Sequence, residues 1–225
     1  ATGSSPVSPP VPGMGEDGVH HCWTLEDVEA IAHRAQKGAD VVLMGAGFIG
    51  CIILESLVER GVNLTVIEAE DRMISKMMDA TGGQMLADWV TSKGGTLMTS
   101  TKVTDVAHQG SKLAVSTDKG DEIPADLVVV ATGVQPNAEF LAGFGVEVQG
   151  GIVVNDHLRS SVANIYAAGD VAQGPDFGGG VNVHAIQPTA ADHGRIAALN
   201  MAGRDVAYQG SLIMNVLDTL GLISA

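Results

Sequence analysis

Gly45-Ala46-Gly47-Phe48-Ile49-Gly50 is the stretch that decides the fold of this chain. The run before it, from Asp40 to Met44, is almost wholly apolar and predicts a strand buried on both faces of a parallel sheet. The residues from Phe48 to Arg60 predict a helix that Gly61 ends. A glycine-rich turn between a strand and a helix is the setting in which the G-x-G-x-x-G pattern binds a dinucleotide.

Each glycine of this motif has its own expected task. Gly45 permits the tight turn, Gly47 lets the backbone approach a pyrophosphate, and Gly50 allows the helix to pack closely on the strand. The phosphates would meet free N–H groups at the positive end of the helix dipole. The alternative is a purely structural strand–turn–helix unit without a ligand.

An acidic residue stands where such a motif needs one. The run from Leu64 to Ile67 predicts the next strand, and Glu68 follows it, 23 residues after Gly45. A carboxylate at this place accepts hydrogen bonds from the ribose hydroxyls of NAD and repels the 2′-phosphate of NADP. Arg72 is the one cation near enough to offset that repulsion. We therefore expect Glu68 and the adjoining Ala69 to bind NAD in preference to NADP.

The composition agrees with a folded α/β protein. The chain has 225 residues, 45% of them hydrophobic, and 29 glycines, which favours many tight strand–helix turns. The net charge of −14 repels phosphate backbones and speaks against nucleic-acid binding. The apolar run from Val41 to Val58 is broken by glycines and Glu55, so we expect no membrane span. The only cysteines, Cys22 and Cys51, favour a reducing, cytoplasmic setting and no disulfide relay.

Periodicity predicts the remaining elements. Alternating stretches between Thr96 and Asp121 indicate an antiparallel meander inserted in the α/β pattern. The other expected elements are an extended connection over 4–18, a helix over 24–36, a helix over 83–92, strands over 127–130, 151–154 and 164–168, and a helix over 189–201. The fold class expected is a Rossmann-like domain with a β-meander insertion.

A short motif occurs twice in the chain. Ala1-Thr2-Gly3-x-x-Pro6 recurs with the same spacing as Ala131-Thr132-Gly133-x-x-Pro136. The two copies suggest two related units, of which the first is cut short at its start.

The stretch IYAAGD, residues 165–170, contains a second glycine–acid pair, Gly169-Asp170. Alone, such a pair is typical of a turn. In order, however, GAGFIG with Glu68, ATGVQPN, IYAAGD and AADHGRIAALNMAG cover nearly the whole chain. With these motifs the chain resembles the FAD-dependent pyridine nucleotide–disulfide oxidoreductase superfamily, most of all its rubredoxin-reductase, ferredoxin-reductase and nitrite-reductase types.

The resemblance implies an FAD domain interrupted by an NAD domain. Its expected bounds are 1–18 for a remnant of the FAD domain and linker, 19–145 for the NAD domain, 146–210 for the returning FAD segment and 211–225 for the start of a truncated interface domain. The FAD glycine motif would lie upstream of Ala1. The resemblance assigns these residues to the cofactors: Thr2, Gly3, Gly169, Asp170, Pro188 and Thr189 to FAD, and Gly45, Ala46, Gly47, Phe48, Ile49, Gly50, Glu68, Ala69 and Gly133 to the dinucleotide sites.

The function implied is an NADH-dependent flavoprotein oxidoreductase. Hydride would pass from NADH to FAD and on to an acceptor that is a redox protein or a small molecule, with a homodimer as one expected state of the complete protein. No acid, base or nucleophile of this chain need be catalytic, since the cofactors carry the redox chemistry. One departure from the family pattern is Ile52, where relatives often carry Glu. The alternative function is a non-catalytic NAD-binding module that senses redox state. His20-His21-Cys22 lacks a second cluster with zinc-like spacing, so no metal site is expected.

Overall fold

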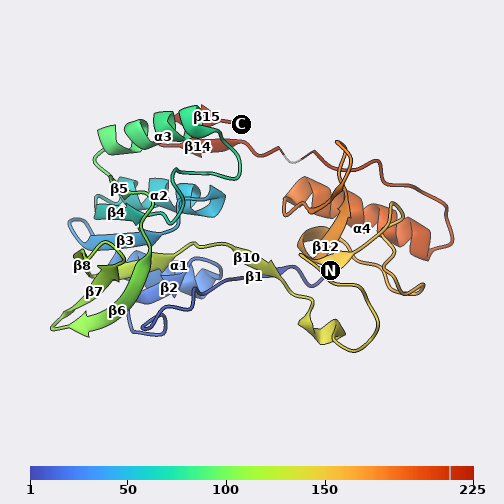
Figure 1. Cartoon of the computed structure of the whole chain (residues 1–225), viewed down its shortest axis with the longest axis horizontal. Helices are drawn as coiled ribbons and strands as arrows, with labels where there is room; N and C mark the ends of the chain where they lie inside the picture. Colours follow the sequence, from blue (N-terminus) through green and yellow to red (C-terminus); the bar gives the residue numbers. More distant parts are fainter. Residues whose placement is uncertain (213) are drawn as a thin grey trace. The chain divides into compact units, whose positions relative to one another are not determined.

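The computed structural model describes residues 1–212 and 214–225, and these divide into two compact units. The large unit comprises Pro6–Gly133 and Val216–Ala225, and the small unit comprises Ala1–Ser5 and Val134–Asn215. Figure 1 labels most of the helices and strands along the chain. The elements of the large unit are β2 (Val19–His21), α1 (Leu25–Arg34), β3 (Asp40–Met44), α2 (Phe48–Glu59), β4 (Asn63–Ile67), α3 (Ala80–Ser92), β5 (Thr96–Met98), β6 (Val103–Gln109), β7 (Lys112–Thr117), β8 (Glu122–Ala125), β9 (Leu127–Val130), β14 (Leu217–Thr219) and β15 (Leu222–Ser224).

A five-stranded parallel sheet organises the large unit. Its strand order is β2-β9-β3-β4-β5, with β3 paired to β4 on one side and to β9 on the other. From β3 the chain continues outward to β4 and β5, whereas β9 lies on the other side of β3. The strand order therefore reverses at the boundary between β3 and β9. The three strands β6, β7 and β8 form a separate antiparallel sheet. The predicted α/β class with a β-meander insertion therefore agrees with the structure.

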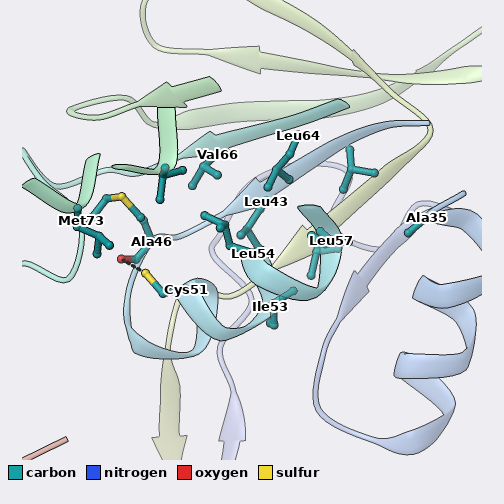
Figure 2. Packing of buried hydrophobic residues seen from close by; sticks show 14 of the residues in the cluster. Ala35, Leu43, Ala46, Cys51, Ile53, Leu54, Leu57, Leu64, Val66 and Met73 are labelled. Atoms are coloured by element: carbon teal, nitrogen blue, oxygen red, sulfur yellow. Dashed lines mark hydrogen bonds between the residues drawn. The ribbon is translucent and has the colours of Figure 1, made fainter. Parts of the chain in front are cut away.

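Both faces of the parallel sheet are covered, which explains why its strands are apolar throughout. Along β3, Val41 and Leu43 pack with residues of α1, α2 and α3, as Figure 2 shows for Leu43, Leu54 and Leu57. Val42 and Met44 point to the opposite face and pack with the antiparallel meander. Successive residues of β3 thus point to opposite faces of the sheet and contribute to two hydrophobic cores, one under the helices and one under the meander.

The helices of the large unit begin in two different ways. Thr24 caps α1 through a capping box with Asp27, and Asp79 caps α3 by accepting the N–H of Gly82. By contrast, Gly47 stands at the N-cap of α2 and provides no side-chain cap. The first turn of α2 therefore keeps backbone N–H groups without a side-chain partner.

The small unit is built around one sheet and one long helix. Its elements are β11 (Ile152–Val153), β12 (Ala172–Pro175), β13 (Val181–Val183), α4 (Gln187–Met201) and the short 3₁₀ turns η1 (Glu139–Leu141) and η2 (Gly169–Val171). The strands β11, β12 and β13 pair in that order, and Ile196 and Ala197 of α4 contribute to the core with Leu158 and Val171. Two further strands, β1 (Ser4–Pro6) and β10 (Val134–Pro136), pair with each other as a two-stranded ribbon.

Two sequence predictions were wrong at the level of single elements. Thr96–Met98 was expected to open the antiparallel meander, but it pairs in parallel with β4 as the edge strand of the main sheet. Residues 164–168 were expected to form a strand, yet only an isolated bridge between Arg159 and Tyr166 occurs there. Both stretches are short, so their periodicity does not distinguish a parallel edge or an extended loop from other pairings.

The C-terminal hairpin β14–β15 belongs to the large unit. Leu217 is 1% exposed and joins the core under the helices, together with Leu220 and Leu222. The indole N–H of Trp89 on α3 donates to the carbonyl of Thr219 at 3.1 Å. The sequence-based bounds, which assign 211–225 to an interface domain, stay a prediction about a longer protein. In this chain the last ten residues complete the core of the large unit.

Leu217→Ala should lower the free energy of unfolding by about 2–5 kcal/mol, because it removes a buried side chain and leaves a cavity. Ile223→Ala is the matched control on the paired strand, since Ile223 is 70% exposed. This control should lower the free energy of unfolding by about 0.5 kcal/mol or less, as is usual for substitutions at exposed positions. Urea denaturation followed by circular dichroism measures both. Equal losses for the two variants would contradict a structural role for the docked hairpin.

Candidate functional site

The fingerprint turn lies at the carboxyl end of β3, next to the end of β9. These two strands flank the reversal point of the sheet, which is where open α/β folds bind their ligands. The structure brings together Gly45 to Gly50, Glu68 at the end of β4 and the stretch from Ala131 to Gly133 after β9. All of these residues belong to the large unit.

Three glycines of the turn meet three different steric demands. Gly45 has φ +100°, and a Cβ there would stand 2.5 Å from the carbonyl oxygen of Ala131. A Cβ at Gly50 would collide with the carbonyl of Gly45. A Cβ at Gly47 would meet no atom within 4 Å. Gly45 and Gly50 are therefore required by the fold itself, whereas the bare backbone of Gly47 opens onto free space of the kind that a pyrophosphate needs.

The carboxylate of Glu68 holds the fingerprint turn in place. Its Oε2 accepts the N–H of Ala46 at 2.6 Å, and its Oε1 accepts the N–H of Glu70 at 2.8 Å. The carbonyl of Ala46 accepts the N–H of Ile74 at 2.8 Å and the thiol of Cys51 at 3.6 Å, the contact dashed in Figure 2. Both the N–H and the carbonyl of Ala46 are thus held by hydrogen bonds. Sequence reasoning assigned Glu68 only to ribose and missed this structural task.

The guanidinium of Arg72 is engaged by its own loop. Its Nε donates to the carbonyl of Met78 at 3.0 Å, and its Nη2 donates to the carbonyl of Ser75 at 3.3 Å. Its Nη1 pairs with the carboxylate of Asp71 at 2.6 Å. All three guanidinium nitrogens of Arg72 thus have partners in the segment from Asp71 to Met78. Ala69 is exposed beside Glu68.

Other residues named from the sequence lie around the start of α2. Phe48 and Ile49 are half-buried and pack against the core under the helices. Ile52 is 48% exposed on the same helix, so the family's usual acidic position presents an apolar side chain here.

The two cysteines are free thiols with different surroundings. Burial, and to a smaller extent the nearby Glu68 carboxylate, raise the pKa of Cys51 to about 12. Burial also raises the pKa of Cys22, with Asp27 as the second cause. Both groups therefore stay protonated near neutral pH, which makes them poor nucleophiles.

A second candidate site lies within the small unit. Gly169 has φ +75° and turns the chain so that Asp170 follows at the start of η2. The hydroxyl of Ser4 donates to Oδ2 of Asp170 at 3.3 Å, which joins the first copy of the repeated motif to this turn. Gly3 has φ +68° with no atom near its missing Cβ.

The start of α4 resembles that of α2 in one respect. Its N-cap, Ile186, offers no side-chain cap, and Pro188 lies in the first turn. Thr189 is buried, and its hydroxyl bonds to that of Ser211 at 2.9 Å. Backbone groups rather than the Thr189 side chain are what this helix start can offer a ligand. Of the α-helices in the described part of the chain, α2 and α4, which were expected to face cofactors, lack side-chain caps, whereas α1 and α3 have them.

The repeated motif forms a ribbon with matching bonds in both copies. The hydroxyl of Thr2 donates to the carbonyl of Asn137 at 2.7 Å, and that of Thr132 donates to the carbonyl of Val7 at 2.8 Å. The backbone repeats the pattern: Asn137 N–H to Gly3 O at 2.9 Å, and Val7 N–H to Gly133 O at 3.0 Å. Each bond is reproduced when both residue numbers are exchanged between copies, so the ribbon has a local two-fold symmetry.

A family model described as pyridine nucleotide-disulphide oxidoreductase matches residues 1–198. The chain belongs to this family. The match covers the fingerprint turn, both copies of the repeated motif and the Gly169-Asp170 turn. Among the described residues, no helix is both long and apolar enough to cross a membrane.

Three relatives illustrate the similarity. Rhodocoxin reductase of Rhodococcus erythropolis is 35% identical over 93% of this chain and 49% of its own length. Subunit epsilon of the NADH-dependent phenylglyoxylate dehydrogenase of Aromatoleum evansii is 31% identical over 98% of this chain and 53% of its own length. A solved FAD-dependent pyridine nucleotide-disulphide oxidoreductase from Desulfovibrio vulgaris is 31% identical, with a TM-score of 0.80 over 93% of this chain and 54% of that one. The chain spans about half the length of the curated relatives it matches.

Gly47→Val should abolish NADH binding by this chain and leave its fold intact. The added Cβ would stand in the free space in front of the turn, with no protein atom within 4 Å. Gly15→Val is the matched control, because a Cβ at Gly15 also meets no atom and lies outside the turn. Isothermal calorimetry with NADH, after circular dichroism of each variant, measures the outcome. Retained NADH affinity in folded Gly47→Val would mean that the motif is only structural.

Proposed function

We propose that the complete protein is an NADH-dependent flavoprotein oxidoreductase. The observation that carries this proposal is the family match over both units, each of which has a positive-φ glycine turn next to an acidic side chain. When bound, the cofactors supply the redox chemistry: the nicotinamide of NADH gives a hydride, which carries two electrons, to FAD, and the electrons pass on to a redox protein or a small molecule. The residues of this chain bind and orient the two cofactors.

The large unit is the proposed NADH site. The turn from Gly45 to Gly50 and the uncapped start of α2 would accept the pyrophosphate on backbone N–H groups. Glu68 would accept a ribose hydroxyl and, at the same time, keep the peptide of Ala46 fixed. Gly133, exposed at the end of the β9 segment, would line the same side of the turn. We infer a preference for NAD over NADP, because Arg72 is held by its own loop.

The small unit is the proposed partial FAD site. Asp170 would accept hydrogen bonds from the ribityl chain, beside Thr2 and Gly3. The start of α4 at Pro188 and Thr189 would present its positive dipole end to the flavin ring. A module that only senses NAD needs no such second unit, so the sensing alternative is not favoured. The two free thiols support a reducing compartment, and we propose the cytoplasm.

Glu68→Gln should narrow the preference for NADH over NADPH by about 1–3 kcal/mol, since it removes the charge that repels the 2′-phosphate. Gln keeps one oxygen that can accept the N–H of Ala46 and loses the acceptor for the N–H of Glu70, so circular dichroism of the variant checks that it is still folded. Glu70→Gln is the matched control, because its side chain is exposed two residues away. Calorimetric titration with both dinucleotides gives the two affinities. Equal or tighter NADPH binding by the unmodified chain would refute the proposed preference.

This chain alone should bind NADH but retain no FAD. The groups proposed for NADH are all present in the large unit, whereas the FAD site has the Asp170 turn but no glycine motif for the FAD pyrophosphate. A ribityl contact does not replace phosphate recognition. Absorbance of the purified chain after incubation with FAD and gel filtration measures this. A yellow protein with stoichiometric FAD would overturn the division of sites.

A further inference from the structure

The small unit contains a buried histidine that the proposed function leaves without a role. His193, on α4, is completely buried, and its Nδ1 accepts the backbone N–H of Gly169 at 3.4 Å. Its Nε2 has no hydrogen-bond partner among the described residues. The ring therefore has one polar contact, and that contact goes to the turn that presents Asp170.

The helix packs closely on this turn at two neighbouring points. A Cβ added at Gly169 would stand 3.3 Å from Cβ of Ala190, so the first turn of α4 is in contact with the glycine. His193 follows Ala190 by three residues and hence lies on the same helix face. Glycine adopts many backbone conformations, including the φ of +75° at Gly169, so contacts with α4 restrict this turn to one of them. On its other side, Asp170 accepts the hydroxyl of Ser4.

The contact requires one protonation state of the ring. A backbone N–H can only donate, so Nδ1 must carry a lone pair and the ring proton must sit on Nε2. Burial lowers the pKa of His193 below its ordinary value of 6.5, the neighbouring His184 lowers it further, and Asp192 raises it. Near neutral pH the ring is therefore neutral.

Asp192, the residue before His193 on α4, favours the protonated ring, but its influence on the pKa of His193 is smaller than that of burial and of His184. Tyr208 meets the ring edge-on, with ring centroids 4.6 Å apart. His184 is itself buried and lies 3.9 Å from Asp176. On the bonded turn, Asp170 is engaged by Ser4.

We propose that His193 is a positioning residue of the flavin half-site: its neutral ring holds the N–H of Gly169 and thereby fixes the turn from which Asp170 meets the ribityl chain. Protonation of the ring places a proton on both nitrogens and removes the acceptor. The turn is then released and FAD binding weakens. This inference rests on the proposed function, because it assigns His193 a task at the FAD site.

The sign of the pH effect follows from linkage. In the folded unit without FAD, the pKa of His193 already lies below its ordinary value of 6.5, so the ring keeps its bond to the turn at all pH values above about 6.5. As the pH falls past the lowered pKa of His193, a growing share of the rings is protonated and must lose the proton before FAD binds. Within this window the FAD dissociation constant should rise by up to about tenfold per pH unit for one proton.

The first experiment measures FAD binding to the complete protein between pH 5 and 8, a range that spans roughly the histidine titration. His193→Gln keeps an acceptor oxygen that does not titrate, so its FAD affinity should stay flat across the window. His193→Leu offers no acceptor, so its affinity should be about five- to hundredfold lower even at pH 8. His157→Gln, which removes a more exposed histidine of the same unit, should keep the wild-type profile. A His193→Gln profile identical to wild type, or wild-type affinity in folded His193→Leu, would overturn the proposal.

The second experiment uses this chain without FAD and is independent of the proposed function. Nitrogen-15 NMR of the histidine rings should find Nδ1 of His193 unprotonated and Nε2 protonated at pH 7.5. Hydrogen exchange of the Gly169 amide should be slow in the wild type and in His193→Gln, and at least tenfold faster in His193→Leu. A proton on Nδ1 overturns the inference even if FAD binds. Absence of FAD binding by the complete protein, with these signatures intact, overturns the proposed function instead.

Discussion

The close approach of α2 to the ends of β3 and β9 is the constraint on which the large unit depends. Neither Gly45 nor Gly50 leaves room for a Cβ, so the helix can begin at this place only because both side chains are missing. That start directs the uncapped N–H groups of α2 towards the free space in front of Gly47. In the same turn, the N–H of Ala46 donates to Glu68 and its carbonyl accepts the thiol of Cys51. One steric requirement thus sets the geometry of the proposed NADH site.

The central part of this architecture could be predicted from the sequence. The run from Asp40 to Met44 became β3 with the expected bounds, because a strand buried on both faces must be apolar at every position. Thr24 was expected to cap a helix, and the capping box with Asp27 agrees. These features are local: each depends on a few neighbouring residues and on well-known turn or cap chemistry.

The features that the sequence did not predict depend on contacts between distant residues. The parallel pairing of Thr96–Met98 depends on β4, and nothing in three residues specifies a partner. Leu217 is buried only because α2 and α3 present a surface for it. The bond from Ala46 to Glu68 joins two motif residues that were assigned to a ligand and not to each other. Likewise, the contact of His193 with Gly169 spans 24 residues and has no periodic signal.

The order in which a ribosome makes this chain gives the β1–β10 ribbon a further consequence. Ser4 to Pro6 are synthesised well before their partner strand, which begins only at Val134. Until then, the first strand has an unpaired edge, of the kind that invites pairing with other chains. The large unit is completed later still, because β14 and β15 of its core follow the segment Val134–Asn215 of the small unit. Neither unit can be completed early, and so their folding during synthesis is coupled to the arrival of segments made late.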